Sequence, residues 1–156
     1  MSTSPIDLAA LQGIIERHGA DGARLLQVLH DVQDRFQHIS RPAMCVIAEA
    51  LAVPLTQVQA VTEFYSFLST EPLGRYAFRL SDSITDQLLG SRGIAEYLAE
   101  RLAVQPGETR ADGLVSFGFT SCTGLADQGP AALVNGHWLP RLDRDRVDRI
   151  ADLVER

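Results

Sequence analysis

Cys122 is the residue in this sequence whose type and setting are best suited to chemistry. It lies in the stretch FTSCTGLADQGPAALVNG, Phe119–Gly136, where a strand-like run ends at Thr120 and Gly129 with the following proline closes a loop. Loops at the ends of strands are frequent sites for ligands and cofactors. A thiol there could act as a nucleophile, a redox sensor or one metal ligand. The other interpretation is a small, partly buried apolar side chain.

Few side chains are placed to join Cys122 in a catalytic or metal site. Nucleophilic catalysis needs a base within hydrogen-bond reach, and the nearest histidine in sequence, His137, lies across a predicted hairpin. The remaining histidines lack the spacing of a helical zinc site and have no CxxC partner; they are His18, His30 and His38. The loop also has neither the lysine of a P-loop nor a GxGxxG spacing. We therefore expect no catalytic residue, and we expect solvated or capping histidines.

The second cysteine and the loop carboxylates are expected to have structural roles. Cys45 falls inside an amphipathic helical pattern, which favours a packed helix residue. Two cysteines in such different contexts do not indicate a disulfide framework. Asp82, Asp86 and Asp127 could form an acidic rim near the Cys122 loop. Carboxylates in loops are more often simply solvated, and we expect that here.

Composition and charge exclude several classes of protein. A chain of 156 residues is about one domain, or one domain plus a helical extension. It can bury about 68–70% of its unfolded surface, so it needs no disulfide or metal to fold. The net charge of −6 argues against a nucleic-acid partner, because phosphate contacts need a basic surface. No run approaches the roughly 18 apolar residues of a membrane span, and the N-terminus lacks the pattern of a signal peptide. We expect a cytoplasmic protein without direct membrane insertion.

The first half of the chain is predicted to form a helical bundle over residues 1–70. Apolar residues recur at helical spacing in four segments, which span residues 6–17, 21–36, 40–51 and 56–68. The predicted N-terminal caps are Ser4 with Pro5, then Asp21, then Ser40, and a capping box formed by Thr56 and Gln59. The turn-forming stretch SFLSTEPLGR, Ser66–Arg75, is expected to join this bundle to the second half.

The second half changes to the alternating pattern of strands and is predicted to form a sheet domain over residues 75–156. Strands are expected at residues 75–80, 114–120, 131–134 and 137–139, and helices at 91–102 and 144–155. The segments 81–87 and 106–113 are expected to be loops, and Asn135-Gly136 predicts a hairpin turn. This order gives an α+β fold that is thioredoxin-like in outline, with about four strands and one parallel crossover. Thioredoxin-like domains often have a cis-proline before the third strand, where Pro130 stands.

Taken in order, these pieces resemble the 24 kDa subunit family of respiratory complex I. The segments that carry the resemblance are LLQVLHDVQDRFQHIS, IAEAL, VQAVTEFYSFL, GETRADG and PAALVNG, and they extend from about Leu25 to the C-terminus. The family includes counterparts in NAD-reducing hydrogenases and NAD-dependent formate dehydrogenases. The resemblance implies an N-terminal helical bundle and a thioredoxin-like [2Fe-2S] ferredoxin domain. Through the loops SDSITDQLLG and CTGLADQGPA, the chain looks especially like the cluster-degenerate N-terminal domain of the diaphorase large subunit of NAD-reducing hydrogenases.

The family holds its cluster through four cysteines, spaced C-x4-C after the first strand and C-x3-C after the second. Carried over position by position, these ligands fall on Ser81, Asp86, Cys122 and Ala126. Only Cys122 is a cysteine, and thiolate sulfurs are what hold such clusters. Ser81 and Asp86 could offer oxygen to iron, but the methyl group of Ala126 cannot ligate. The resemblance therefore implies that the [2Fe-2S] cluster is lost, and no cofactor or metal is expected.

In the family this domain docks on the flavoprotein subunit that oxidises NADH or reduces NAD. The resemblance thus implies an accessory subunit of an NAD(H)-linked oxidoreductase of the hydrogenase, formate dehydrogenase or complex I type, which is not catalytic alone. Its expected partner is the FMN- and NAD-binding flavoprotein subunit. Two alternatives stay open: an electron-transfer [2Fe-2S] protein with non-standard ligands, and a single-thiol redox protein on a thioredoxin-like fold.

Overall fold

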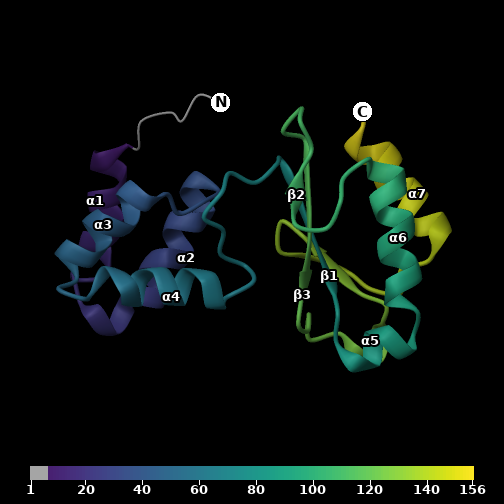
Figure 1. The fold of residues 1–156 in the computed structure, drawn as a ribbon, viewed down its shortest axis with the longest axis horizontal. Coiled ribbons are helices and arrows are strands. Elements are labelled where there is room, and N and C mark those ends of the chain that lie inside the picture. The colour runs from purple at the N-terminus through teal and green to yellow at the C-terminus, as the bar shows by residue number, and fades with distance from the viewer. Residues whose placement is uncertain (1–6) are drawn as a thin grey trace. The chain divides into compact units, whose positions relative to one another are not determined.

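A computed structural model describes residues 7–156, and the chain divides into two compact units between Pro72 and Leu73 (Figure 1). The first unit is helical, and the second contains the sheet. The predicted caps Ser4 and Pro5 lie outside the described residues. None of the helices from residue 7 onward is long and apolar enough to cross a membrane.

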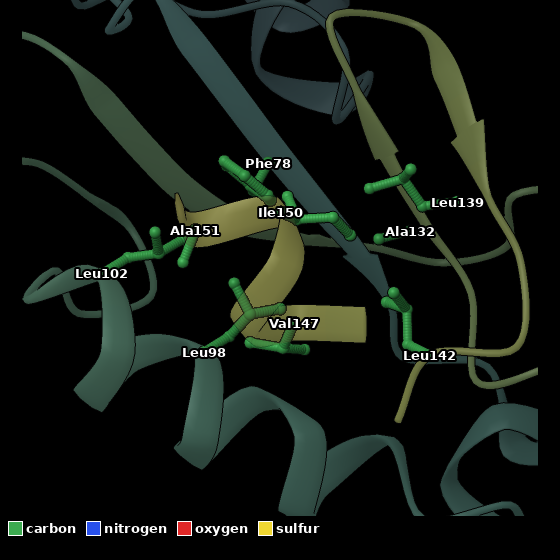
Figure 2. A pocket seen from close by; sticks show the side chains of 9 residues that line it. All are labelled: Phe78, Leu98, Leu102, Ala132, Leu139, Leu142, Val147, Ile150 and Ala151. Carbon is green, nitrogen blue, oxygen red and sulfur yellow. The ribbon is translucent and has the colours of Figure 1, made fainter. Parts of the chain in front are cut away.

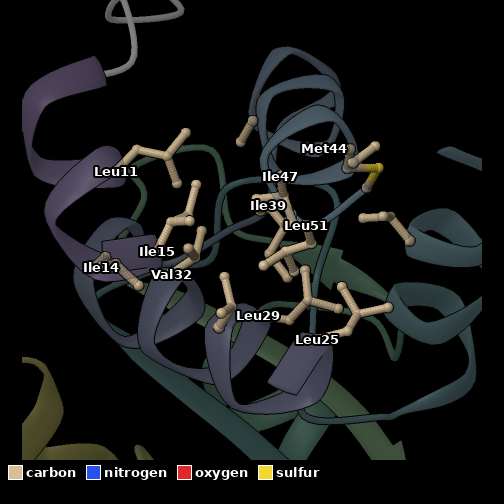
Figure 3. Close-up of a cluster of buried hydrophobic side chains, with 14 of the residues drawn as sticks. Leu11, Ile14, Ile15, Leu25, Leu29, Val32, Ile39, Met44, Ile47 and Leu51 are labelled. Carbon is tan, nitrogen blue, oxygen red and sulfur yellow. The ribbon is translucent and has the colours of Figure 1, made fainter. Parts of the chain in front are cut away.

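The first unit is a bundle built from the predicted amphipathic segments. Its α-helices are α1 (Leu8–Arg17), α2 (Leu25–Phe36), α3 (Arg41–Ala50) and α4 (Leu55–Phe64). Their apolar stripes meet in one core, part of which is drawn in Figure 3. Side chains that are buried there include Leu11, Ile15, Leu29, Val32 and Ile47. The burial of aliphatic side chains from separate helices supplies most of the stability that short helices lack on their own.

Side-chain caps fix the start of three segments in this unit. The Asp7 carboxylate accepts a hydrogen bond from the Ala10 N–H at the start of α1. Asp21 caps a short 3₁₀ turn that leads into α2, and Ser40 caps α3 as predicted. These caps satisfy N–H groups that have no partner inside the helix.

The capping box predicted for the fourth helix is wrong. α4 begins at Leu55, behind Pro54, and has no side-chain cap. Gln59 donates instead to the Glu63 carboxylate, one turn further along the same helix. The fixed φ of Pro54 already favours a helix start at this position, so α4 can begin here without a side-chain cap.

The second unit is a mixed sheet with helices packed on it. Its strands are β1 (Tyr76–Ser81), β2 (Glu108–Thr109), β3 (Val115–Thr120), β4 (Ala132–Val134) and β5 (His137–Leu139). They lie in the order β2-β3-β1-β4-β5, with β1 parallel to β3 and every other pair antiparallel. Its helices are α5 (Ile84–Leu88), α6 (Ser91–Leu102) and α7 (Arg144–Val154). This arrangement is the predicted thioredoxin-like α+β fold.

Two segments that were predicted to be loops contain short elements. α5 occupies part of the segment 81–87 because Ser83 caps it, accepting a hydrogen bond from the Asp86 N–H. β2 lies within 106–113 and pairs with β3, so the sheet has five strands instead of the four expected. Neither element has the length that a hydrophobic pattern needs to be visible in sequence.

The core of this unit lies between the sheet and the pair α6 and α7. Figure 2 shows apolar side chains from β1, α6 and α7 converging, among them Phe78, Leu98 and Val147. The space left between them is only about 10 Å³, room for about one water molecule. This core is packed and holds no ligand pocket.

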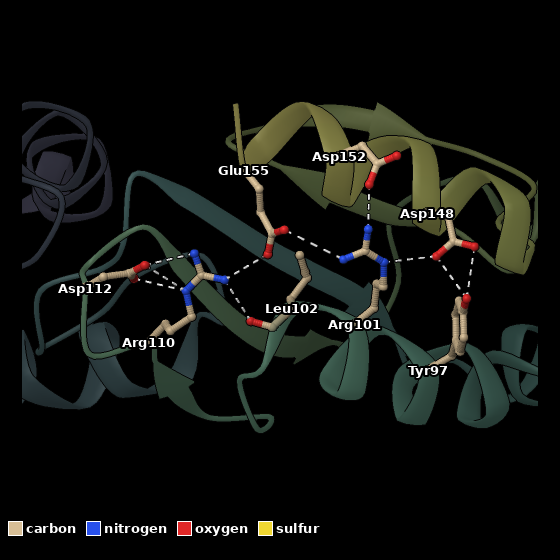
Figure 4. A network of polar contacts seen from close by, with 8 residues as sticks. All are labelled: Tyr97, Arg101, Leu102, Arg110, Asp112, Asp148, Asp152 and Glu155. Carbon is tan, nitrogen blue, oxygen red and sulfur yellow. Dashed lines mark hydrogen bonds and ion pairs between the residues drawn. The ribbon is translucent and has the colours of Figure 1, made fainter.

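Two arginines fasten α6 and the loop after it to α7 (Figure 4). Arg101 pairs with Asp148, Asp152 and Glu155 of the last helix and its end. Arg110 contacts Glu155 as well and holds Asp112 at 2.9 Å. The Arg110 guanidinium lowers the pKa of the Asp112 carboxyl through that hydrogen bond.

Candidate functional site

The parallel pairing of β1 and β3 brings the predicted ligand positions to one end of the sheet. Ser81 lies opposite Thr120 in the register, and the Asp82 N–H donates to the Thr120 carbonyl at 2.8 Å. The loop after β1 and the loop after β3 therefore start side by side. Carboxyl ends of parallel strands are where open α/β sheets place ligands.

The β1 side of this site is closed by a buried carboxylate. Ser81 is 0% exposed and Asp86 is 1% exposed. The Ser81 hydroxyl donates to the Asp86 carboxylate at 2.6 Å, and the Ser83 hydroxyl donates to the same oxygen at 2.6 Å. The Ala131 N–H donates to the other oxygen at 3.1 Å. We call these four residues the Asp86 network.

The Asp86 network corrects the expectation that Asp86 is a solvated loop carboxylate. A buried carboxylate is costly unless donors replace its water, and here three donors do so. They come from the end of β1, from the cap of α5 and from the segment that enters β4. One carboxylate thus ties three parts of the chain together.

Gly129 packs closely against the Asp86 carboxylate. A Cβ atom at Gly129 would lie 2.5 Å from an Asp86 oxygen and 2.8 Å from a Leu89 methyl carbon. No larger side chain fits there without movement of its neighbours. The Gly129–Pro130 peptide bond is cis, at the place where thioredoxin-like domains often have a cis-proline.

The β3 side of the site is open. Cys122 is exposed, so the interpretation as a small, partly buried apolar side chain is wrong. In the described part of the chain its sulfur accepts one hydrogen bond, from the Gly124 N–H at 3.3 Å, and no hydrogen bond joins it to His137. Ala126 begins a short 3₁₀ turn, Ala126–Gln128, and Asp127 within this turn is exposed. Asp127 is therefore a solvated loop carboxylate, as expected.

The residues at the four ligand positions do not fit a [2Fe-2S] cluster. Such clusters take four soft ligands, almost always thiolates. The site offers one thiol, a serine hydroxyl, a carboxylate with three donors already bound, and a methyl group. Between residues 7 and 156, no group of three or more His, Cys, Asp or Glu side chains could hold a metal ion.

Asp82 is exposed in the sheet unit, whereas Cys45 and the remaining histidines lie in the helical unit. Cys45 is exposed, so the prediction of a packed helix residue is wrong. His18 ends α1, and its ring nitrogen lies 2.9 Å from the Asp31 carboxylate, whose pKa this hydrogen bond lowers. His30 lies 3.3 Å from Asp34 on an exposed face. His30 is therefore solvated and His18 caps α1, as expected, although the His18 side chain is half-buried, as is His38 beside the Phe36 carbonyl.

Comparison with known proteins extends the resemblance to nearly the whole chain. The family model described as thioredoxin-like [2Fe-2S] ferredoxin matches residues 11–155. The chain is 30% identical over 141 residues to the NAD-reducing hydrogenase HoxS subunit alpha of Cupriavidus necator, covering 90% of this chain and 23% of that one. It is 31% identical over 122 residues to a subunit of the NADH-quinone oxidoreductase of Salmonella typhimurium, covering 77% and 74% respectively.

A solved structure agrees with these sequence matches. The crystal structure of NAD⁺-reducing [NiFe]-hydrogenase in the H₂-reduced state superposes with a TM-score of 0.73 at 31% identity, over 87% of this chain and 23% of that chain. The chain thus spans about a quarter of the hydrogenase subunit it matches. The family match begins at residue 11, earlier than the Leu25 at which the sequence resemblance began. This chain belongs to the thioredoxin-like [2Fe-2S] ferredoxin family.

Proposed function

We propose that this chain is an accessory subunit of an NAD(H)-linked multi-subunit oxidoreductase, that it docks on the flavoprotein subunit in the cytoplasm, and that it carries no [2Fe-2S] cluster. The relatives support the first part, since their names place them in an NAD-reducing hydrogenase and an NADH-quinone oxidoreductase. The family's docking on flavoproteins supports the second. The Asp86 network supports the third.

The hydrogen bond between Ser81 and Asp86 carries the argument for cluster loss. These are two of the four positions onto which the family's ligands fall, and the Ser81 hydroxyl donates to the Asp86 carboxylate at 2.6 Å. To ligate iron, both would have to leave a buried network in which every donor has an acceptor. On the other side, Ala126 offers no ligand at all. Without a cluster, binding to a neighbouring subunit is the family property left to this chain.

The lengths of the relatives fit a docking module. In the matched subunit of the quinone oxidoreductase, this region makes up 74% of the chain. In the hydrogenase subunit it makes up 23%, so the same fold is joined to a much longer chain. A module that occurs both as most of a small subunit and as part of a large one is suited to stabilising a neighbour.

A single experiment separates the clusterless subunit from an electron-transfer protein. The chain is purified without oxygen, incubated with iron and sulfide under reducing conditions, desalted, and assayed for iron, sulfide and visible absorbance. We expect less than about 0.1 iron per chain and no absorbance that dithionite bleaches. Stoichiometric iron with a reducible chromophore would overturn the loss of the cluster. A family member with all four cysteines serves as the positive control.

Docking is tested on its own. The chain is titrated with the flavoprotein subunit of an NAD-linked complex from the same organism, and binding is followed by calorimetry and gel filtration. A stable one-to-one complex is the expected result. If no complex forms with any candidate flavoprotein subunit, the docking function is wrong. An activity of the isolated chain that Cys122→Ser abolishes would instead favour a single-thiol redox protein.

A further inference from the structure

The helical unit carries a groove between α1 and α3 that the core does not fill. The groove has a volume of about 570 Å³. Apolar side chains along it include Leu8, Ile15 and Val46. Leu8 is 53% exposed, although it stands in an amphipathic helix where leucines normally pack. The volume is within the range of about 300–1,000 Å³ typical of ligand pockets.

Both walls of the groove carry the same charge. Among the described residues that line it, the charged side chains are Glu16 from α1 and Glu49 from α3, and both are exposed. Arg17 is the cation next to Glu16 in sequence, but it is paired with Asp31 of α2 at 3.2 Å. The rims of the groove are therefore acidic above an apolar floor.

The shape of the groove matches a helix better than a small molecule. Leu8, Gln12 and Ile15 follow one another at helical spacing along α1, so the lining is a stripe that runs with the helix. Each wall is a helix of ten residues, about 15 Å long. Ala20 and Ala50 in the lining leave room for close approach. Grooves of this kind take an amphipathic helix through side chains at positions i, i+3, i+4 and i+7.

We propose that this groove binds a helix of the partner flavoprotein subunit, which places aliphatic side chains between α1 and α3 and Lys or Arg side chains beside Glu16 and Glu49. The inference rests on the proposed docking function and assigns a surface to it. The acidic rims favour an occupant with basic side chains, and the proposed docking function supplies the flavoprotein subunit as its source. A second copy of this chain is disfavoured, because each copy has a net charge of −6 and acidic groove rims.

The test compares charge reversals in and outside the groove, in the full chain. Glu16→Lys with Glu49→Lys reverses the rims, and Asp34→Lys with Glu63→Lys makes the same change in net charge on exposed positions of α2 and α4. We expect the rim variant to bind the flavoprotein subunit at least tenfold more weakly. The control variant should stay within about twofold of the unmodified chain.

A second pair of variants tests the shape of the groove without changing its charge. Ala50→Trp puts an indole into the groove, and Ala60→Trp puts the same group on an exposed position of α4. We expect Ala50→Trp to weaken binding at least tenfold and Ala60→Trp to leave it within about twofold. Circular dichroism and thermal unfolding of every variant show that the bundle is intact.

The other outcomes each decide the question. If the unmodified chain binds and the groove variants bind equally well, the groove assignment is wrong while the docking function stands. If the groove and control variants lose affinity equally, the groove has no special role. Self-association that disappears in the rim variant would make a second copy the occupant and overturn the assignment. If the unmodified chain binds no flavoprotein subunit, the docking function and this inference both fail.

Discussion

On the β1 side of the site, Ser81 and Asp86 are buried and hydrogen-bonded to each other. On the β3 side, Cys122 is exposed, and the methyl side chain of Ala126 has no atom that could ligate a metal. In the family, both sides face the same cluster. In this chain one side has a hydrogen-bond network at the ligand positions, and the other is an ordinary loop.

Burial explains why the two sides differ. A polar group out of contact with water must find partners in the protein, because leaving it unpaired costs about 1–3 kcal/mol or more. Ser81 is the last residue of a central strand and has no access to water, so its partner had to come from the chain. Cys122 is exposed, and water can surround its loop. Hydrogen-bond partners within the chain are therefore needed at the buried positions and not at the exposed one.

Asp86→Ala should give the largest loss of stability, because it removes the shared acceptor on the buried β1 side of the site. It leaves the Ser81 hydroxyl and the Ala131 N–H without their acceptor. We expect the sheet unit to lose about 3–4 kcal/mol of stability. Hydrogen exchange in urea, read separately for peptides of the two units, measures this loss. The helical unit is the internal control, and equal loss in both units would contradict a local role.

Asp86→Asn separates the contribution of the charge from that of the shape, since an asparagine amide has nearly the size and shape of the carboxylate but no charge. We expect about half of the loss seen for Asp86→Ala, because hydrogen bonds to charged groups are roughly twice as strong as neutral ones. An asparagine as stable as the aspartate would mean that shape alone holds the three segments together.

Gly129→Ala should give the second largest loss of stability among the changes at different positions. The added methyl group would stand 2.5 Å from an Asp86 oxygen that its donors hold in place. We expect a loss of about 2 kcal/mol, the cost of overpacking a buried site. Gly93→Ala in α6 is the matched control, since its Cβ meets nothing within 4 Å and alanine favours helices. Equal stability of the two variants would show that the loop yields easily.

Ser81→Ala should cost about 1.5 kcal/mol, the worth of one hydrogen bond to a charged acceptor. A double-mutant cycle with Asp86→Ala measures the coupling directly. We expect the two losses to fall short of additivity by about 1 kcal/mol, because the Ser81 hydroxyl has no acceptor left once the carboxylate is gone and keeps only the Ser83 N–H, at 3.4 Å. Additive losses would mean that the 2.6 Å contact contributes no net stability.

The sequence was informative about position and less so about environment. The four ligand positions came from the family resemblance. Strand ends at Leu80 and Thr120, within one residue of the observed ends at Ser81 and Thr120, could be predicted from alternation. The burial of Asp86 could not, because one of its donors, Ala131, lies 45 residues away. One signal was nevertheless present: Ser83 and Asp86 have the spacing of a capping box, which indicates the start of α5.

Cys45 shows a second limit of reading residue types. Its neighbours Met44, Ile47 and Ala48 are buried in the bundle core. Cys45 falls off their stripe and is exposed. The helical period contained this information, because only residues on the apolar stripe face the core, and a place inside an amphipathic segment was not enough to predict packing. Position on the helix face decided the outcome for Cys45.

Cys122→Ser should give the smallest effect and tests the open side. The thiol is exposed, and its single hydrogen bond, with the Gly124 N–H, can be kept by a serine oxygen. We expect a change in stability within about 0.5 kcal/mol, as for surface positions in general. Hydrogen exchange of the 121–130 loop is the readout, with Cys45→Ser as the matched exposed cysteine. A loss comparable to that of Ser81→Ala would contradict the difference between the two sides of the site, since it would show that the stability of the β3 side also depends on Cys122.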